Sequence, residues 1–322
     1  MIIGFYVRKI IFGGGERMKL ALMTEFIKQG HEIYIYSHNN DELNKLSFPF
    51  KRIILDKKKN KIVQAISDVF VINNSLKKAD IDCFISFGFS MRYIVTSYFN
   101  NICSIIYFTV DPKWIKNKIM LWIRSKVCCS LCDGIIHQTQ KIQKRYSRPI
   151  QTKSIVIPNP IMDDFLPIPL KQRRRKIVSI GRLSEEKNFP LLINAFSNIS
   201  TNDYTLHIYG NGPLKSYLQD LIITLKMQDK IFLEGHVNRV IDKISDAEIF
   251  VICSNYEGMP NALIEAMSMG LACISTNFPS GAAEELIHNY ENGIIVEVGN
   301  QKQLELSIRS LIKDKNLCAK LK

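Results

Sequence analysis

Short apolar runs alternate with amphipathic stretches along nearly the whole chain, and this alternation constrains the fold more than any other feature. The runs have the length of strands, and the stretches between most of them repeat their apolar residues with the period of a helix. Such alternation predicts parallel sheets covered by helices on both faces. The predicted strands are 2–7, 32–37, 82–87, 103–108, 134–137, 153–157, 176–180, 204–209, 230–233, 248–252, 271–276 and 293–297. The predicted helices are 16–30, 59–79, 188–200, 213–227, 260–270 and 300–313.

The alternation stops near the middle of the chain. Proline-rich sequence at 157–169 is followed by the basic run Lys171–Lys176, and neither shows periodicity, which is typical of a linker. The 322 residues suffice for two domains of ordinary size. We therefore predict an α/β protein with two Rossmann-like, doubly wound parallel-sheet domains, residues 1–160 and 161–322, facing each other across a cleft.

The net charge of +13 is unevenly distributed. Residues 1–160 contain 25 Lys and Arg against 11 Asp and Glu, whereas residues 161–322 contain 18 against 19. This asymmetry predicts that the N-terminal half meets a negatively charged partner, namely nucleic acid, an anionic membrane surface or a phosphorylated substrate. The sequence contains no recognisable nucleic-acid-binding motif, so we expect no nucleic acid partner.

Apolar runs and cysteines indicate the compartment. No run is long enough to cross a bilayer, and the apolar start ends at Arg8, too early for a signal peptide, so we expect a cytoplasmic protein. Scattered cysteines fit a reducing compartment. Four lie in strand-like runs and are predicted core residues: Cys83, Cys103, Cys253 and Cys273. The Cys128–Cys132 segment lacks a second half with zinc-site spacing, so we expect no metal.

Two predicted strand ends in the second half carry residues suited to a diphosphate. Arg182 and Lys187 follow the strand 176–180, and ligands of open α/β sheets bind at the carboxyl ends of strands. A guanidinium and an ammonium group suit a diphosphate whose charge grows as a bond breaks. A solvated loop with two surface charges explains this stretch equally well. Gly210 and Gly212 follow the next strand and would let the backbone approach a ligand, although a structural turn is the commoner explanation.

The segment Glu257–Met267 has the sharpest pattern. A loop containing Glu257 leads into a helix that starts near Pro260, and a helix N-terminus favours phosphate. Glu265 lies inside that helix, and an ionised carboxylate accepts hydrogen bonds from sugar hydroxyls. The alternative for Glu265 is a buried carboxylate satisfied by local donors. In the first half, Gly13–Gly15 opens a helix after the first strand and could approach an anion.

Together these stretches resemble the retaining glycosyltransferases of family 4, which have the GT-B fold. The family pattern is present as G-R-L-x-x-E-K-N at Gly181–Asn188, Y-G-N-G-P at Tyr209–Pro213, E-G-M-P-N-A-L-I-E-A-M at Glu257–Met267 and G-G-x-E-R at Gly13–Arg17. Ser280–Glu284 is similar to a segment of capsule, lipopolysaccharide and other surface-polysaccharide transferases.

The resemblance implies a role for each site residue. Arg182 and Lys187 neutralise the donor diphosphate, Glu257 lies near the transferring sugar, and Glu265 holds the ribose. Further donor-binding positions are Gly14, Gly15, Gly181, Gly210, Gly212, Gly258, Met259, Pro260 and Asn261. No metal or cofactor is implied, because the two cations and the helix dipole act on the diphosphate. Asp80-Ile81-Asp82 has the D-x-D spacing of a different, metal-dependent transferase fold, but it precedes a strand, so we interpret it as turn residues.

Two positions depart from the family pattern. Many relatives have a His in the loop that here reads Phe108–Pro112, where Asp111 has no assigned role. The sequence also ends at Lys322, before the last helix that in relatives crosses back onto the N-terminal domain. Residues 112–132 combine both tryptophans with lysines and arginines, so this segment is either a core helix with a basic face or a contact with an anionic membrane.

The sequence thus predicts transfer of a hexose or N-acetylhexosamine from a nucleotide sugar, UDP-linked by preference, to a lipid-linked or growing surface glycan. The expected place is the inner face of the plasma membrane, with the protein peripherally bound. Alternatives are a nucleotide-sugar epimerase or hydrolase of the same fold, and an inactive scaffold subunit of a transferase complex.

Overall fold

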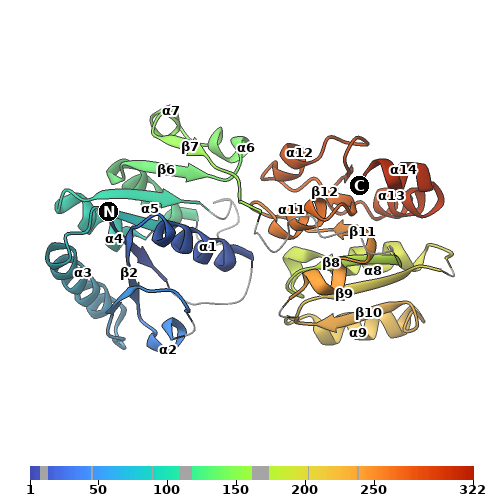
Figure 1. Cartoon of the computed structure of the whole chain (residues 1–322), viewed down its shortest axis with the longest axis horizontal. Helices are drawn as coiled ribbons and strands as arrows, with labels where there is room; N and C mark the ends of the chain where they lie inside the picture. The colour runs from blue at the N-terminus through green and yellow to red at the C-terminus, as the bar shows by residue number, and fades with distance from the viewer. Residues whose placement is uncertain are drawn as a thin grey trace. The chain divides into compact units, whose positions relative to one another are not determined.

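The chain forms two compact units, Met1–Asn159 and Pro160–Lys322. Each unit contains one parallel sheet with helices packed on it (Figure 1), which confirms the predicted pair of α/β domains. The computed structural model describes residues 1–7, 14–44, 46–88, 90–108, 118–161, 174–201, 203–237 and 239–322.

The N-terminal domain has the strand order β3-β2-β1-β4-β5-β6-β7. The order reverses between β1 and β4, as in doubly wound sheets. The strands are β1 (Ile2–Tyr6), β2 (Glu32–Ser37), β3 (Lys51–Ile54), β4 (Cys83–Phe87), β5 (Cys103–Tyr107), β6 (Gly134–His137) and β7 (Ser154–Val156). The helices are α1 (Gly14–Lys28), α2 (Asn40–Leu43), α3 (Lys61–Lys78), α4 (Met91–Phe99), α5 (Lys118–Leu131), α6 (Gln140–Gln143) and α7 (Arg148–Gln151).

The C-terminal domain has the strand order β10-β9-β8-β11-β12-β13, which reverses between β8 and β11. Its strands are β8 (Arg174–Ile180), β9 (Thr205–Tyr209), β10 (Ile231–Gly235), β11 (Ala247–Ile252), β12 (Ala272–Thr276) and β13 (Ile294–Val296). Its helices are α8 (Phe189–Ser197), α9 (Lys215–Thr224), α10 (Ile241–Ile244), α11 (Asn261–Ser268), α12 (Ala282–Leu286), α13 (Gln301–Lys313) and α14 (Lys315–Lys320), with a 3₁₀ turn at Glu185–Lys187.

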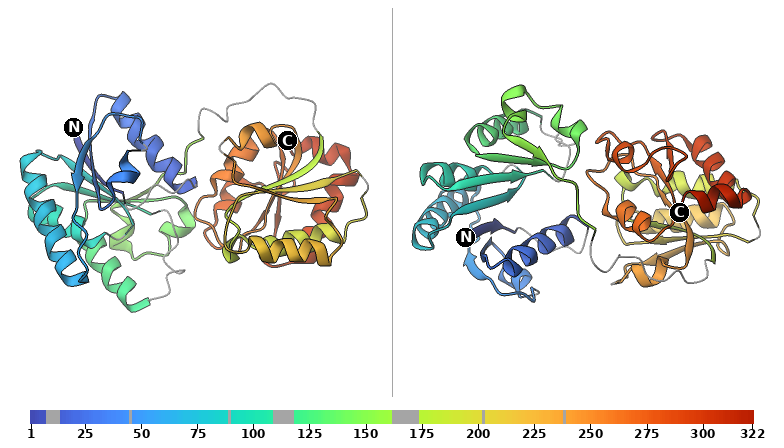
Figure 2. Two further views of the ribbon diagram at one scale, coloured as in Figure 1. Left: turned by 90° about the horizontal axis from the view of Figure 1, so that it is seen from below. Right: turned by 45° about the horizontal axis from the view of Figure 1, so that its top comes forward.

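Both faces of the C-terminal sheet are buried, as a parallel sheet requires. Successive strand residues point to opposite faces, so Ile177 and Val178 of β8 belong to different apolar clusters. Ile249 and Phe250 of β11 divide in the same way. Figure 2 shows this sheet between its layers of helices. The rigid sheet fixes the loops at its carboxyl edge, where the candidate site lies.

Two details of the N-terminal domain concern the cysteines and the D-x-D segment. All eight cysteines are free thiols, but the prediction that Cys103 is a core residue was wrong. Cys103 is exposed because it is the first residue of β5, at the rim of the sheet. Asp82 accepts a 2.7 Å hydrogen bond from the backbone N–H of Ile2, and Asp80 has a φ of 46°, so both belong to a turn that supports β1.

None of the helices in the described ranges is both long enough and apolar enough to traverse a bilayer.

His137, at the end of β6, makes the stability of the N-terminal domain depend on pH. Its buried ring stacks on Phe108, with a centroid distance of 5.2 Å, and lies tilted against Tyr146, with a centroid distance of 4.9 Å. Neither ring nitrogen has a hydrogen-bond partner within the described residues. Burial lowers the pKa of His137 from 6.5 to about 4. The unfolded imidazole therefore takes up a proton at a higher pH than the folded one, so stability is full above about pH 6.5 and falls as the pH approaches 4.

We expect His137→Phe, which preserves the stacking, to remove a pH-dependent loss on the order of 3 kcal/mol. Urea unfolding at neutral pH and at about pH 4 measures this loss through tryptophan fluorescence, because Trp114 and Trp122 both belong to this domain. An unchanged pH dependence in the variant would show that other groups cause the loss.

Candidate functional site

The candidate site lies at the carboxyl edge of the C-terminal sheet, where the strand order reverses. β8 and β11 are neighbours there, although about 70 residues separate them along the chain. Gly181 and Arg182 follow β8, and the loop that contains Glu257 follows β11. Open α/β sheets bind their ligands at this kind of position.

Lys187 and Glu257 form an ion pair across this reversal. The ammonium nitrogen of Lys187 lies 2.5 Å from Oε1 of Glu257, and the Ser254 hydroxyl donates to the same oxygen at 2.6 Å. Both members of the pair are partly buried. Because burial weakens screening by water, the pair holds a cation and a carboxylate in fixed places. Arg182 is exposed, and no ion pair of Arg182 is found within the described ranges.

Hydrogen bonds join the two loops that carry this pair. The backbone N–H of Asn255 donates to the Glu186 carbonyl at 2.8 Å, and the Asn255 side chain donates to the Glu185 carbonyl at 3.1 Å. Asn188 has a left-handed backbone, with a φ of 49°, and its side chain donates to Asn255 Oδ1 at 3.0 Å. Sequence reasoning gave Asn255 no role. The only available signal was the asparagine at position 188, a residue type that tolerates positive φ.

Buried polar side chains hold the loop after β11 through hydrogen bonds to backbone carbonyls. Burial raises the pKa of Cys253 to about 12, so its thiol stays protonated and donates to the Lys187 carbonyl at 3.2 Å. The Thr276 hydroxyl donates to the Ser254 carbonyl at 2.7 Å, and the Ser280 hydroxyl donates to the Gly258 carbonyl at 2.8 Å. The site therefore rests on a hydrogen-bonded frame.

The glycines after β8 and β9 allow two loops to pack backbone against backbone. A Cβ on Gly210 would lie 1.9 Å from the Gly181 carbonyl oxygen, and one on Gly212 would lie 2.3 Å from the Leu183 carbonyl oxygen. A Cβ on Gly181 would lie 3.3 Å from the side chain of Lys187. The glycine pattern therefore has a structural role in placing Arg182 and Lys187. The donor contacts predicted for these glycines stay a prediction.

We expect Gly210→Ala to destabilise the C-terminal domain by about 2 kcal/mol, because its φ of 146° and the Gly181 carbonyl both oppose a side chain. Gly299→Ala is the matched control. Gly299 also has a positive φ, 77°, but an added Cβ meets nothing within 4 Å. Its expected loss is about 1 kcal/mol. Equal losses in chemical denaturation would show that the contact with Gly181 contributes nothing.

Helix α11 continues the site from the loop after β11. Pro260 is its N-cap, and the helix begins at Asn261, close to the predicted start. Glu265 is buried one turn into the helix, and Met259 is buried in front of it. The N-terminus of α11 offers backbone N–H groups and the positive end of the helix dipole. An anion bound here would meet these groups as well as the nearby cations.

Only some of the site residues predicted in the N-terminal domain lie within the described ranges. Gly14 is the first residue of α1, and an added Cβ at the exposed Gly15 would meet nothing within 4 Å. Asp111 lies outside the described residues, as do the side chains of both tryptophans in 112–132. The described part of that segment is α5, whose Cys128 and Cys129 are buried. This part matches the core-helix alternative, and the membrane contact of 112–132 stays a prediction.

The C-terminal domain is similar to a family of known proteins. Residues 163–322 match the model of the family described as glycosyl transferases group 1. The C-terminal half of the chain is therefore similar to this family. This confirms the resemblance to glycosyltransferases.

Two relatives are enzymes of Campylobacter jejuni. One is named N-acetylgalactosamine-N,N'-diacetylbacillosaminyl-diphospho-undecaprenol 4-alpha-N-acetylgalactosaminyltransferase, and it is 36% identical over 141 residues, 44% of this chain and 38% of that enzyme. The other is named GalNAc-alpha-(1->4)-GalNAc-alpha-(1->3)-diNAcBac-PP-undecaprenol alpha-1,4-N-acetyl-D-galactosaminyltransferase, and it is 25% identical over 98% of this chain and 90% of that enzyme. The chain thus matches well under half of the first relative and nearly all of the second.

A solved structure extends the likeness to both domains. HepE of Anabaena in complex with UDP superposes with a TM-score of 0.83 at 15% identity, over 100% of this chain and 92% of that one. At this identity the likeness shows the fold, and it confirms the predicted GT-B fold.

Proposed function

We propose that the chain is a retaining glycosyltransferase that moves a hexose or N-acetylhexosamine from a UDP-sugar to a lipid-linked or growing surface glycan. The observation that carries this proposal is the Lys187–Glu257 pair at the strand reversal, directly before the N-terminus of α11. The acceptors named for the two Campylobacter relatives are undecaprenol-linked glycans, which supports the acceptor class. The UDP bound to HepE supports the donor class.

In the proposed reaction, the bond between the anomeric carbon and the diphosphate oxygen of the donor breaks. The electron pair leaves with the nucleoside diphosphate. The acceptor hydroxyl oxygen forms the new bond to the anomeric carbon with the same configuration, and its proton is released. Because negative charge grows on the diphosphate, Lys187, Arg182 and the N-terminus of α11 stabilise the transition state more than the ground state.

The remaining site residues have proposed roles in holding the donor. Glu257, fixed by Lys187 and Ser254, lies near the transferring sugar, and Glu265 accepts hydrogen bonds from the ribose hydroxyls. We also propose that the reaction proceeds without a metal or cofactor, because two cations and a helix terminus act on the diphosphate. The proposed place of action is the cytoplasmic face of the membrane that carries the acceptor.

A donor screen with product analysis tests the proposal. The increase in melting temperature with UDP-, GDP- and ADP-sugars is compared in buffer that contains a metal chelator. The glycoside formed from the best donor is then analysed by NMR for its anomeric configuration. We expect selective stabilisation by one UDP-sugar and a retained anomeric centre in the glycoside. Donor turnover without an acceptor would favour an epimerase or hydrolase. A folded chain that binds no nucleotide sugar would favour the scaffold alternative, and an inverted product would refute the mechanism.

A further inference from the structure

Helix α3 (Lys61–Lys78) has an apolar row on the side that faces away from the core. Its inner side buries Asp68, Ile72 and Leu76. On the opposite side, the side chains of Ile62, Ile66 and Phe70 are 71%, 67% and 67% exposed. Val63 and Val69 are also exposed. Spacings of three and four residues place all five on one helix face, which we call the outer row. A helix with apolar side chains on its outer side as well favours a second apolar contact surface besides the core.

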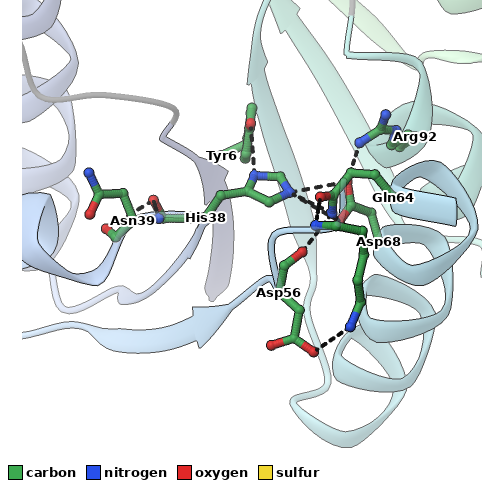
Figure 3. A network of polar contacts seen from close by, with 9 residues as sticks. Tyr6, His38, Asn39, Asp56, Gln64, Asp68 and Arg92 are labelled. Atoms are coloured by element: carbon green, nitrogen blue, oxygen red, sulfur yellow. Dashed lines mark hydrogen bonds and ion pairs between the residues drawn. The ribbon is translucent and has the colours of Figure 1, made fainter. Parts of the chain in front are cut away.

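A polar network fixes this orientation of α3 (Figure 3). Asp68 is 2% exposed and lies 3.1 Å from Nε2 of His38, which follows β2. The Asp68 carboxylate also accepts a hydrogen bond of 2.6 Å from Gln64 and forms an ion pair with Arg92 of α4. The Tyr6 hydroxyl, at the end of β1, lies 3.3 Å from Nδ1 of His38. Turning α3 to bury the outer row would break the hydrogen bonds and the ion pair of Asp68, and a buried carboxylate without partners is costly. The outer row is therefore held towards solvent.

The neighbouring helix α4 also ends in two exposed aromatic residues. Asn100, the C-cap of α4, donates a 2.8 Å hydrogen bond to the side chain of Asn73 in α3. Phe99 and Tyr98 precede it and are 77% and 52% exposed. The end of α4 thus carries two exposed aromatic side chains near residue 73 of α3. Exposed apolar surface on this scale marks an interaction site.

Lysines flank the outer row at both ends of α3. The exposed ones are Lys57, Lys58 and Lys59 before the helix and Lys77 and Lys78 at its end. Asp56 pairs with Lys58 at 3.4 Å, which offsets one of these charges. No acidic residue belongs to the outer row. An apolar row with cations at its borders is complementary to a bilayer with anionic headgroups. The apolar side chains would insert among the lipid acyl chains, and the lysines would bind the headgroup phosphates.

We infer that the outer row of α3, together with Phe99 and Tyr98 of α4, docks the N-terminal domain on an anionic phospholipid bilayer. This places the membrane contact on α3, apart from the segment 112–132. It goes beyond the proposed transfer reaction and does not depend on it. The five lysines contribute about fivefold each to the partition coefficient near an anionic surface, and the apolar row contributes on every bilayer.

Flotation with vesicles tests this inference. The wild-type chain is compared with Ile66→Ser/Phe70→Ser on vesicles of phosphatidylcholine alone and of phosphatidylcholine mixed with phosphatidylglycerol. Tyr217→Ser/Ile223→Ser is the matched control, because it removes two half-exposed apolar side chains from α9 of the other domain. We expect wild type and control to float with the anionic vesicles and the α3 variant to lose at least about tenfold in partitioning.

A second variant separates charge from apolar contact and from the other basic segment. Lys57→Ala/Lys58→Ala/Lys59→Ala should weaken binding to anionic vesicles by about a hundredfold and leave the weak binding to neutral vesicles unchanged. Equal flotation of wild type and the α3 variant would refute the inference, as would binding lost only when the lysines of 112–132 are replaced. If size-exclusion chromatography showed a dimeric wild type and a monomeric α3 variant, the outer row would be a contact between two copies of the chain instead. Circular dichroism of each variant verifies folding, and donor binding in solution separates failure here from failure of the proposed reaction.

Discussion

Lys187→Ala should lower the kcat/KM of sugar transfer by about a thousandfold, mostly through kcat, because one fixed cation on a developing charge is typically worth 10²–10³ in rate. The structure holds Lys187 in place before any donor arrives. Its ammonium group is bound to Glu257, and its alkyl chain packs beside Gly181. The charge therefore requires little reorganisation as the diphosphate leaves. Loss of the same cation also leaves Glu257 partly buried without its ion-pair partner, with the Ser254 hydroxyl still bonded to it.

The measurement is initial-rate kinetics with the donor found in the screen, combined with thermal unfolding of each variant. Lys302→Ala is the matched control, since it removes a lysine that pairs with a glutamate, Glu305, at 3.2 Å on α13. Its kcat/KM should stay within about twofold of wild type. A Lys187→Ala enzyme that keeps more than a tenth of wild-type kcat would exclude Lys187 from the transition state. A higher KM with unchanged kcat would assign it to binding alone.

The sequence predicted the layers of the fold because nearly every strand carries its own apolar signal. β8 and β11 are apolar runs bounded by turn residues, and the structure has them within two residues of the predicted ranges. β3 (Lys51–Ile54) was missed because it begins with two charges and is largely exposed, so it has no buried-strand pattern. Helix α4 was missed too, although four of its residues are buried. It packs against α3 and α5, and no local sequence pattern encodes such tertiary contacts.

The candidate site was predictable by residue but not by contact. Both Arg182 and Glu257 follow predicted strands, so a site at the carboxyl edge could be inferred. That Lys187 would bind Glu257 depends on β8 pairing with β11, and the sequence does not give the strand order. The His38–Asp68 contact joins a loop to a helix 30 residues away without any motif. Such long-range polar contacts are set by the tertiary fold, after the local elements form.

Glu265→Gln should weaken binding of a UDP-sugar by about a hundredfold, because hydrogen bonds to an ionised group contribute about 1.5–3 kcal/mol. Glu265 is buried in α11, so its carboxylate would meet a bound donor with little competition from water. The amide of Gln offers one acceptor oxygen and one NH₂ donor, and it carries no charge. Affinity should therefore fall even though the size of the side chain is unchanged.

A double-mutant cycle with a 2′-deoxyribose donor shows whether the ribose is the group that Glu265 binds. Wild type should bind the 2′-deoxy donor at least about tenfold more weakly than the ribose donor, because a buried carboxylate loses a hydroxyl partner. Glu265→Gln should bind the two donors almost equally, since the interaction is already lost. Titration calorimetry gives the four affinities, and Glu234→Gln, on the outer strand β10, is the control substitution. If Glu265→Gln weakened both donors and kept the wild-type ratio between them, Glu265 would stabilise α11 from within, and the ribose would be held by other groups.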